Sequence, residues 1–156
     1  MKIVSIAGNY ELCEKVKEYC KEKWEKVYGC FADCADKSAA AAFLPQTWAA
    51  LGEEDEIIGF YQLSEHDLIT RKDEFTPFIT SLFVDPNMRG GLGMGKMLLD
   101  HARNEAAKLG FDKLYLTTDH IGYYEKYGFR EIGLDLYDWG RPTKLYEADT
   151  YGDIQS

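Results

Sequence analysis

The residues best suited to chemistry form a glycine-rich stretch, RGGLGMGKM, at positions 89–97. It follows the apolar run FITSLFV and precedes a helical pattern. Glycines have no Cβ, so several backbone N–H groups can turn toward one anion, and the following helix N-terminus adds a partial positive charge. Arg89 and Lys96 add two cations. The stretch therefore predicts a phosphate site that needs no metal ion.

Two common phosphate loops fit this stretch poorly. Positions 90–96 match G-x-x-x-x-G-K of nucleoside-triphosphate enzymes, but Met97 stands where a Ser or Thr should ligate magnesium. The dinucleotide pattern G-x-G-x-x-G fails because the glycines lie at 90, 91, 93 and 95. The stretch is therefore interpreted as a phosphate site built from backbone amides, with the triphosphate loop as the weaker alternative.

The elements around the loop predict a mixed α/β or α+β sheet. Asn9 is expected to cap a helix that ends at Gly29, and a second helix is expected over about 31–42. The later helix begins at Gly93, with its apolar face formed by Met94, Met97, Leu98, His101, Ala102, Ala106 and Leu109. Strands are expected in MKIVSIA, QTWAAL, EIIGFYQL, PFITSLFVD, KLYLTT, FREIGLDLYDW and TKLYEADT, and a short helix in IGYYEKYG. The order is β-α-α-β-β-β-α-β-α-β-β.

Composition limits the partners and the compartment. The 156 residues carry 27 acidic and 18 basic side chains, a net charge of -9, which disfavours nucleic acid and anionic membranes and suits a cationic substrate. No apolar run is long enough to span a bilayer and no signal peptide is evident, so a cytoplasmic protein is expected. We expect one domain over residues 1–150 and a loose C-terminal tail over 151–156.

The cysteines do not form a recognisable metal motif. Cys13, Cys20, Cys30 and Cys34 include no C-x-x-C pair, and the three histidines, His66, His101 and His120, lie elsewhere in the sequence. Reduced thiols, packed or half-exposed, and no metal site are expected.

Two motifs together resemble the GNAT family of N-acetyltransferases. The segment LFVDPNMRGGLGMGKMLLDHA looks like the family's strand, R/Q-x-x-G-x-G/A loop and helix, and YYEKYGF is similar to its second signature, Y-E-K-x-G-F. The strong resemblance covers Phe78 to Gly133. Gly93 and Gly95 match the glycine pair when the helix sets the register, and the loop is then one residue longer than usual. The resemblance implies a mostly antiparallel central sheet flanked by helices, in a single domain.

The resemblance also implies acetyl-CoA as co-substrate. The backbone of the strand before the loop would bind the pantetheine arm as an added strand does, and the loop would hold the pyrophosphate. The implied cofactor-binding residues are Leu82, Phe83, Val84, Arg89, Gly90, Gly91, Gly93, Met94, Gly95 and Lys96.

Acetyl transfer to an amine needs two proton movements, because the ammonium must lose a proton and the leaving thiolate gains one. Tyr124 matches the tyrosine of the second signature, which implies that it is the general acid. His120 follows KLYLTTD at the end of a strand and titrates near neutrality, so we take it as the candidate base. Glu65, in a second polar group with His66 and Asp67, is the alternative base.

We therefore expect an N-acetyltransferase that moves acetyl directly from acetyl-CoA to a primary amine of a small molecule or a peptide. The alternative is a coenzyme-A-binding regulatory module without transferase activity. Exposed closing strands are compatible with a homodimer.

Overall fold

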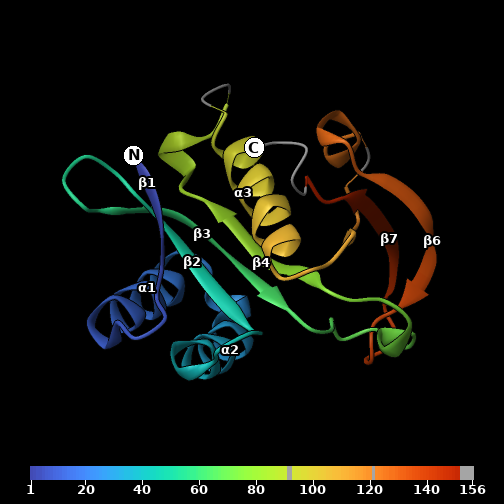
Figure 1. Ribbon diagram of the computed structural model, residues 1–156, viewed down its shortest axis with the longest axis horizontal. Coiled ribbons are helices and arrows are strands. Elements are labelled where there is room, and N and C mark those ends of the chain that lie inside the picture. Colours follow the sequence, from blue (N-terminus) through green and yellow to red (C-terminus); the bar gives the residue numbers. More distant parts are fainter. Residues whose placement is uncertain (91–92, 121, 152–156) are drawn as a thin grey trace. The chain divides into compact units, whose positions relative to one another are not determined.

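The structure is a computed structural model that describes residues 1–90, 93–120 and 122–151 (Figure 1). The chain forms two compact units. The first comprises Met1–Leu63 and Ser81–Leu98, and the second comprises Ser64–Thr80 and Leu99–Ser156.

Seven strands are hydrogen-bonded in the order β1-β2-β3-β4-β5-β7-β6. Strands β4 and β5 pair in parallel, whereas β1–β2, β2–β3, β5–β7 and β6–β7 pair antiparallel. The predicted fold class, a mixed and mostly antiparallel sheet with helices, is confirmed. The elements are β1 (Lys2–Ser5), α1 (Tyr10–Lys23), α2 (Tyr28–Ala40), β2 (Gln46–Leu51), β3 (Ile57–Ser64), β4 (Phe78–Val84), α3 (Met94–Lys108), β5 (Lys113–Thr118), the 3-10 helix η4 (Tyr124–Tyr127), β6 (Arg130–Leu136) and β7 (Pro142–Asp149).

The first helix begins as predicted but ends earlier. The Asn9 side chain accepts a hydrogen bond from the N–H of Leu12 at 3.0 Å, which caps α1. The predicted end at Gly29 is wrong, because α1 stops at Lys23 and Gly29 lies in the first turn of α2. The cause is Trp24, whose φ of -149° leaves the helical region while its ring stacks in the core. Burial of a large aromatic ring outweighs the local helix propensity here.

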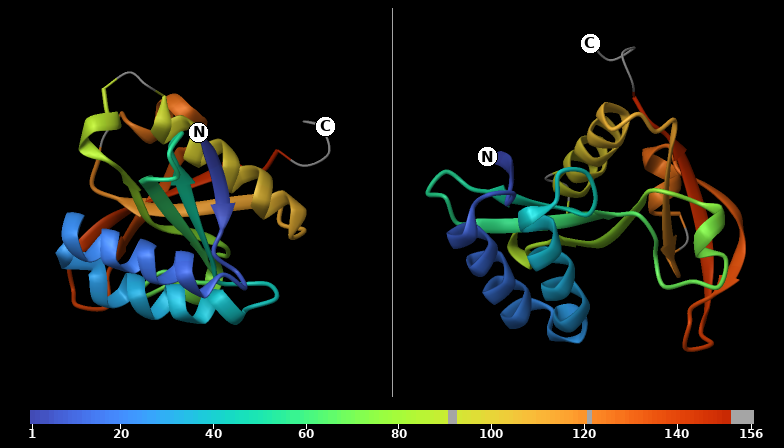
Figure 2. Two further views of the ribbon diagram at one scale, coloured as in Figure 1. Left: turned by 90° about the vertical axis from the view of Figure 1, so that its left-hand side faces the viewer. Right: turned by 60° about the horizontal axis from the view of Figure 1, so that its bottom comes forward.

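The core of the first unit is aromatic and centres on Phe60. Its ring lies 4.5 Å from that of Phe31 and 5.4 Å from that of Phe83, centroid to centroid, and Tyr19 and Trp24 close the cluster. Helices α1 and α2 run side by side along one face of β2 and β3 (Figure 2). Their apolar faces bury Val16, Phe31 and other residues against these strands, so the two helices and the sheet share one core.

Helix α3 buries most of the predicted apolar face, including Met94, Leu98, Ala102 and Ala106, with two differences. Met97 is 43% exposed, whereas Leu99, which the predicted face omitted, is fully buried with Leu98 and Ala102. Residues 98, 102 and 106 lie at i, i+4 and i+8, and Leu99 widens this stripe on the side away from Met97. The predicted face followed spacings of three and four residues, so it omitted Leu99, which is adjacent to Leu98 in the sequence and is also buried.

The second unit contains an antiparallel arrangement of β5, β7 and β6, seen at the orange and red end of the chain in Figure 1. Its hydrophobic cluster consists of Ile69, Phe78 and Leu145 of β7, with Phe75, Tyr115 and Tyr137 packed around it. Thr150, which follows β7, donates its N–H to the carbonyl of Asp112 at 3.0 Å. Residues 152–156 of the expected tail lie outside the described part of the chain. None of the described helices is long and apolar enough to cross a membrane.

Truncation of Phe60 should test the first core. We expect Phe60→Ala to lower the free energy of unfolding by about 3–5 kcal/mol, because it removes the ring that contacts four other aromatic side chains. Tyr10→Ala, at a position that is 77% exposed, should change it by less than about 0.5 kcal/mol. Urea unfolding of both variants measures the difference, and equal midpoints would contradict this account.

Candidate active site

The glycine-rich loop enters α3 through Gly93. The carbonyl of Gly93 accepts the N–H of Met97 at 3.0 Å, so Gly93 directly precedes the first helical residue, Met94, close to the predicted helix start. Gly90 and Gly93 have φ of 81° and 74°, in the left-handed region that favours glycine. A Cβ added at either one would meet no atom within 4 Å. Close protein packing therefore does not explain these two glycines, whereas their backbone conformation and the open space before them suit an anion.

Three of the remaining predicted loop residues lie in the first turn of α3. Met94 is buried and begins α3, Gly95 is the second residue of the helix, and Lys96 presents an exposed side chain in the first turn. Gly91, also expected to bind phosphate, lies outside the described residues together with Leu92. The location of the extra loop residue therefore stays a prediction.

Arg89 contacts the strand that precedes the loop. Its Nε donates to the carbonyl of Val84 at 2.8 Å, and its guanidinium lies over the Phe83 ring at 5.1 Å. These contacts hold the guanidinium at the end of β4, beside two of the three residues expected to bind pantetheine. A carbonyl has two acceptor lone pairs, so Val84 can still accept a second donor.

Asp85 fixes the turn between β4 and the loop. Its carboxylate accepts the Tyr19 hydroxyl at 2.7 Å and the N–H of Asn87 at 3.0 Å. The hydrogen bond from Tyr19 is the main reason that the pKa of Asp85 lies below its usual value. Within β4 itself, Ser81 has a φ of 58°, rare for a residue with a side chain. This interruption lies just before Leu82 and marks the predicted pantetheine segment as irregular strand.

Tyr124 lies in an aromatic environment in the second unit. Its ring centroid is 4.9 Å from that of Tyr123, 6.0 Å from that of Phe129 and 6.3 Å from that of Tyr146. Burial, with smaller electrostatic contributions from Tyr123 and Tyr137, raises the pKa of Tyr124 to about 12. The phenol is therefore protonated at neutral pH.

Other residues of the second signature stabilise η4, the short helix that contains Tyr124. Glu125 accepts the N–H of Gly122 at 3.1 Å and the Tyr146 hydroxyl at 2.9 Å. Gly128 ends η4 with a φ of 88°, and a Cβ there would lie 2.8 Å from Nη1 of Arg103. That same Nη1 donates to the carbonyl of Tyr127 at 2.9 Å. Arg103 therefore supports the signature from α3, a role that its position in the sequence did not reveal.

The predicted base, His120, is exposed. The His120 ring lies 6.2 Å from that of Tyr123, and the backbone N–H of His120 donates to the Thr118 hydroxyl at 3.0 Å. Asp119, the adjacent acid, forms an ion pair with Arg141. His120 thus lies near the aromatic residues of the signature, and its role as a base stays a prediction.

The polar residues at positions 65–67 differ in their exposure to solvent. Glu65, the alternative base, is exposed and lies 3.6 Å from His66 Nε2. Asp67 is half-buried, and its Oδ2 accepts the Thr117 hydroxyl at 2.7 Å. Sequence reasoning did not single out Thr117, because a threonine in a β-strand carries no distinguishing signal.

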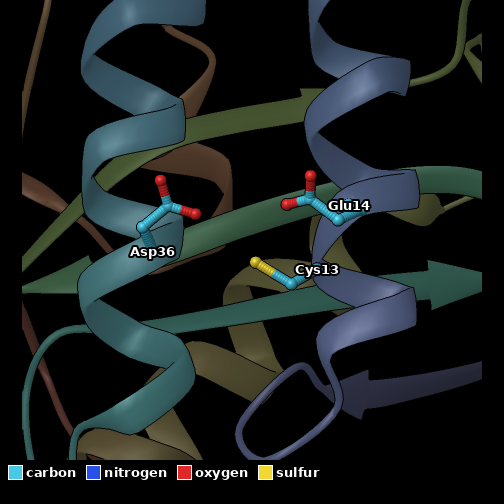
Figure 3. Close-up of side chains that lie close together, drawn as sticks. All are labelled: Cys13, Glu14 and Asp36. Atoms are coloured by element: carbon cyan, nitrogen blue, oxygen red, sulfur yellow. The ribbon is translucent and has the colours of Figure 1, made fainter.

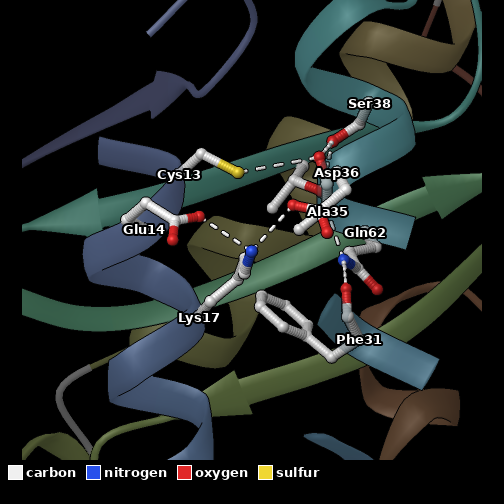
Figure 4. A network of polar contacts seen from close by, with 9 residues as sticks. Cys13, Glu14, Lys17, Phe31, Ala35, Asp36, Ser38 and Gln62 are labelled. Atoms are coloured by element: carbon white, nitrogen blue, oxygen red, sulfur yellow. Dashed lines mark hydrogen bonds and ion pairs between the residues drawn. The ribbon is translucent and has the colours of Figure 1, made fainter. Parts of the chain in front are cut away.

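A group of potential metal ligands lies between α1 and α2, but a lysine side chain neutralises it. Within the described residues, ligand atoms of Cys13, Glu14 and Asp36 lie within 4.8 Å of one another (Figure 3). Figure 4 shows Lys17 Nζ between the two carboxylates, 2.7 Å from Glu14 and 2.8 Å from Asp36. The hydrogen bonds to Asp36 and Glu14 raise the pKa of Lys17, which keeps it charged. We therefore interpret this group as an ion-pair link between two helices.

Comparisons with known proteins agree with this geometry. Residues 14–129 match the model of the Acetyltransferase (GNAT) family. The peptidyl-lysine N-acetyltransferase YjaB of Salmonella typhimurium is 36% identical over 107 residues, covering 66% of this chain and 65% of that protein. Its namesake from Escherichia coli is 32% identical over 107 residues, covering 67% and 65% respectively. The match thus spans just under two thirds of the length of these curated relatives.

The fold has close structural counterparts. The crystal structure of aminoglycoside 6'-acetyltransferase type Ii superposes with a TM-score of 0.72 at 19% identity, over 96% of this chain and 97% of that one. Residues 14–129, which match the family model, contain the glycine-rich loop, Tyr124 and the rest of the second signature. The chain belongs to the GNAT family of acetyltransferases.

Proposed function

We propose that this protein transfers an acetyl group from acetyl-CoA to the side-chain amine of a lysine in a peptide or protein. The observation that carries the proposal is Tyr124, which matches the tyrosine of the second signature and lies in surroundings that keep its phenol protonated. A module that only binds coenzyme A would have no need of a proton donor at this position.

Acetyl-CoA is proposed to bind through the loop and strand of the first unit. Gly90, Gly93, Met94, Gly95 and Lys96 would hold the pyrophosphate at the start of α3, with Gly91 completing the loop. Open space in front of Gly90 and Gly93 supports this assignment. The backbone of residues 82–84 would pair with the pantetheine arm, and Arg89 would stabilise the turn between these two contacts.

Tyr124 is proposed to assist departure of the thiolate. When the C–S bond breaks, its electron pair goes to sulfur, and the phenol donates its proton there. The nitrogen of the tetrahedral intermediate still carries a proton that the amide product must lose, and this proton restores the phenol. The raised pKa of Tyr124, about 12, means that the phenol carries its proton at neutral pH before the transfer.

A lysine acceptor is supported by two features. The curated relatives YjaB are named as peptidyl-lysine N-acetyltransferases. The net charge of -9 attracts a cationic peptide and repels nucleic acid. His120 remains the base proposed from the sequence alone, and a small-molecule amine is the alternative acceptor.

A thiol-release assay should distinguish the enzyme from the binding module. We expect acetyl-CoA and a lysine peptide together to release free thiol, and acetyl-CoA alone to raise the thermal midpoint of the protein. A midpoint that rises without thiol release, with peptides and small amines alike, would contradict transferase activity and favour the module.

Removal of one hydroxyl should test Tyr124. We expect Tyr124→Phe to lower kcat by about 10²- to 10⁴-fold, the range for loss of a general acid, with little change in the KM for acetyl-CoA. Tyr127→Phe removes a hydroxyl from the same helix and should retain activity. Steady-state kinetics of both variants measures the contrast, and an unchanged kcat for Tyr124→Phe would exclude it as the acid.

Substitution of a loop glycine should test the phosphate site. Gly93→Ala places a Cβ on a backbone with φ 74°, which costs about 1–2 kcal/mol, and distortion of the loop should raise the Kd for acetyl-CoA about tenfold or more. Gly29→Ala is the control, because Gly29 lies in α2 and a Cβ there would also meet nothing within 4 Å. Calorimetric titration with acetyl-CoA compares them, and equal affinities would remove Gly93 from the site.

A further inference from the structure

A hydrogen-bonded chain in the second unit ends on Asp67. Its Oδ2 accepts the Thr117 hydroxyl at 2.7 Å, and its Oδ1 accepts the N–H of Leu68 at 2.7 Å. The oxygen of Thr117 also lies 2.9 Å from the hydroxyl of Tyr137. Three residues from the loop after β3, from β5 and from the β6–β7 connection therefore form one continuous polar path.

The direction of this path follows from counting hydrogens. A threonine hydroxyl has one hydrogen, and Thr117 donates it to Asp67, so the hydrogen between Thr117 and Tyr137 belongs to Tyr137. The one hydrogen of Thr143 can be donated to the Tyr137 oxygen at 3.3 Å or to the Lys144 carbonyl at 3.4 Å. The hydrogen of Tyr137 itself leads through Thr117 to the carboxylate.

The surroundings of Tyr137 suit a site that receives an amine. Its ring stacks on that of Trp139, 4.5 Å between centroids and 2° between planes, and Trp139 is largely exposed. An aromatic face attracts a lysine ammonium and its methylene chain. Tyr137 also contributes to the raised pKa of Tyr124, which places its phenol within electrostatic reach of the proposed acid.

We propose that Asp67 is the final acceptor of the proton that the substrate ammonium must lose, reached through Tyr137 and Thr117. The inference rests on the proposed transferase function and replaces His120 as the base. Tyr137 is the group that contacts the substrate nitrogen, and Asp67 acts through it.

Each proton movement in the relay has a donor and an acceptor. An N–H bond of the ammonium breaks as an O–H bond forms at Tyr137, whose own proton passes to the Thr117 oxygen. The proton of Thr117 passes to Oδ2 of Asp67, so the ammonium becomes a neutral amine and the carboxylate becomes a carboxylic acid. Asp67 returns its proton to solvent after the product leaves.

Burial makes the ionised form of Asp67 unfavourable for the stability of the fold. A residue that is unfavourable in this way is better explained by a functional role than by a structural one. Burial raises the pKa of Asp67 despite the hydrogen bonds from Thr117 and Leu68, and Asp138 of the β6–β7 connection adds like-charge repulsion. A carboxyl whose folded-state pKa is raised stabilises the fold only while it is protonated, and this contribution is lost as pH rises through that pKa. Ionisation of Asp67 therefore lowers the stability of the fold, so Asp67→Asn, which cannot ionise, should not lower the thermal midpoint.

The test compares two acceptor peptides that differ in one group. One carries lysine, and the other carries an aminooxy group in place of the ε-ammonium, which reaches the enzyme already unprotonated at pH 7. With lysine, we expect Asp67→Asn, Thr117→Val and Tyr137→Phe each to lower kcat/KM about 100-fold, the lower range for loss of a general base. With the aminooxy peptide, all three variants should approach wild-type rates.

Two controls and the pH dependence complete the experiment. Thr117→Ser retains the hydroxyl and should retain activity, and Asp112→Asn removes an exposed carboxyl of the same unit and should behave as wild type. With lysine, the defect of Asp67→Asn should shrink as pH approaches about 10.4, where the free amine becomes abundant.

The outcomes separate the relay from the activity itself. Equal losses on both peptides, a lowered midpoint for Asp67→Asn, or an active Thr117→Val would overturn the relay while leaving the transferase function in place. A wild-type protein that releases no thiol from either peptide would overturn the proposed function and the relay with it.

Discussion

Burial of aromatic side chains from one strand is the constraint on which the rest of the structure depends. Strand β4 contributes Phe83 to the aromatic cluster of the first unit and Phe78 to the cluster of the second. Ser81, between them, takes a left-handed backbone conformation that a serine adopts only when its surroundings require it. The packing on either side of Ser81 thus imposes an irregular backbone on the segment proposed to meet the cofactor.

The geometry of the glycine-rich loop depends on the end of β4. Asp85 accepts hydrogen bonds at the strand end, and Arg89 returns to the carbonyl of Val84, so the chain is held before it reaches Gly90. Gly93 then supplies the conformation that starts α3. Arg89 therefore contacts the end of the strand, and in the proposed cofactor site the backbone amides and the helix N-terminus would meet the anion.

The second unit shows the usual conflict between stability and chemistry. Burial raises the pKa of both Tyr124 and Asp67, which makes the ionised form of each less favourable. Residues chosen for stability alone would not place a carboxylate and three hydroxyls in one half-buried path. Sites that depart from the most stable arrangement are where function is most often found.

The sequence by itself determined the order of the elements, a mixed sheet and the glycine-rich loop, because these depend on local periodicity and on backbone conformations that single residues require. The signature around Tyr124 was found through the resemblance of its motif to the GNAT family. The end of α1 at Trp24, the buried Leu99 and the support of Gly128 by Arg103 depended on packing between distant segments. Only the tertiary structure joined Asp67 to Thr117, 50 residues away, and to Tyr137. A hydrogen bond of this kind leaves no pattern along the chain, since its partners meet only after the sheet has formed.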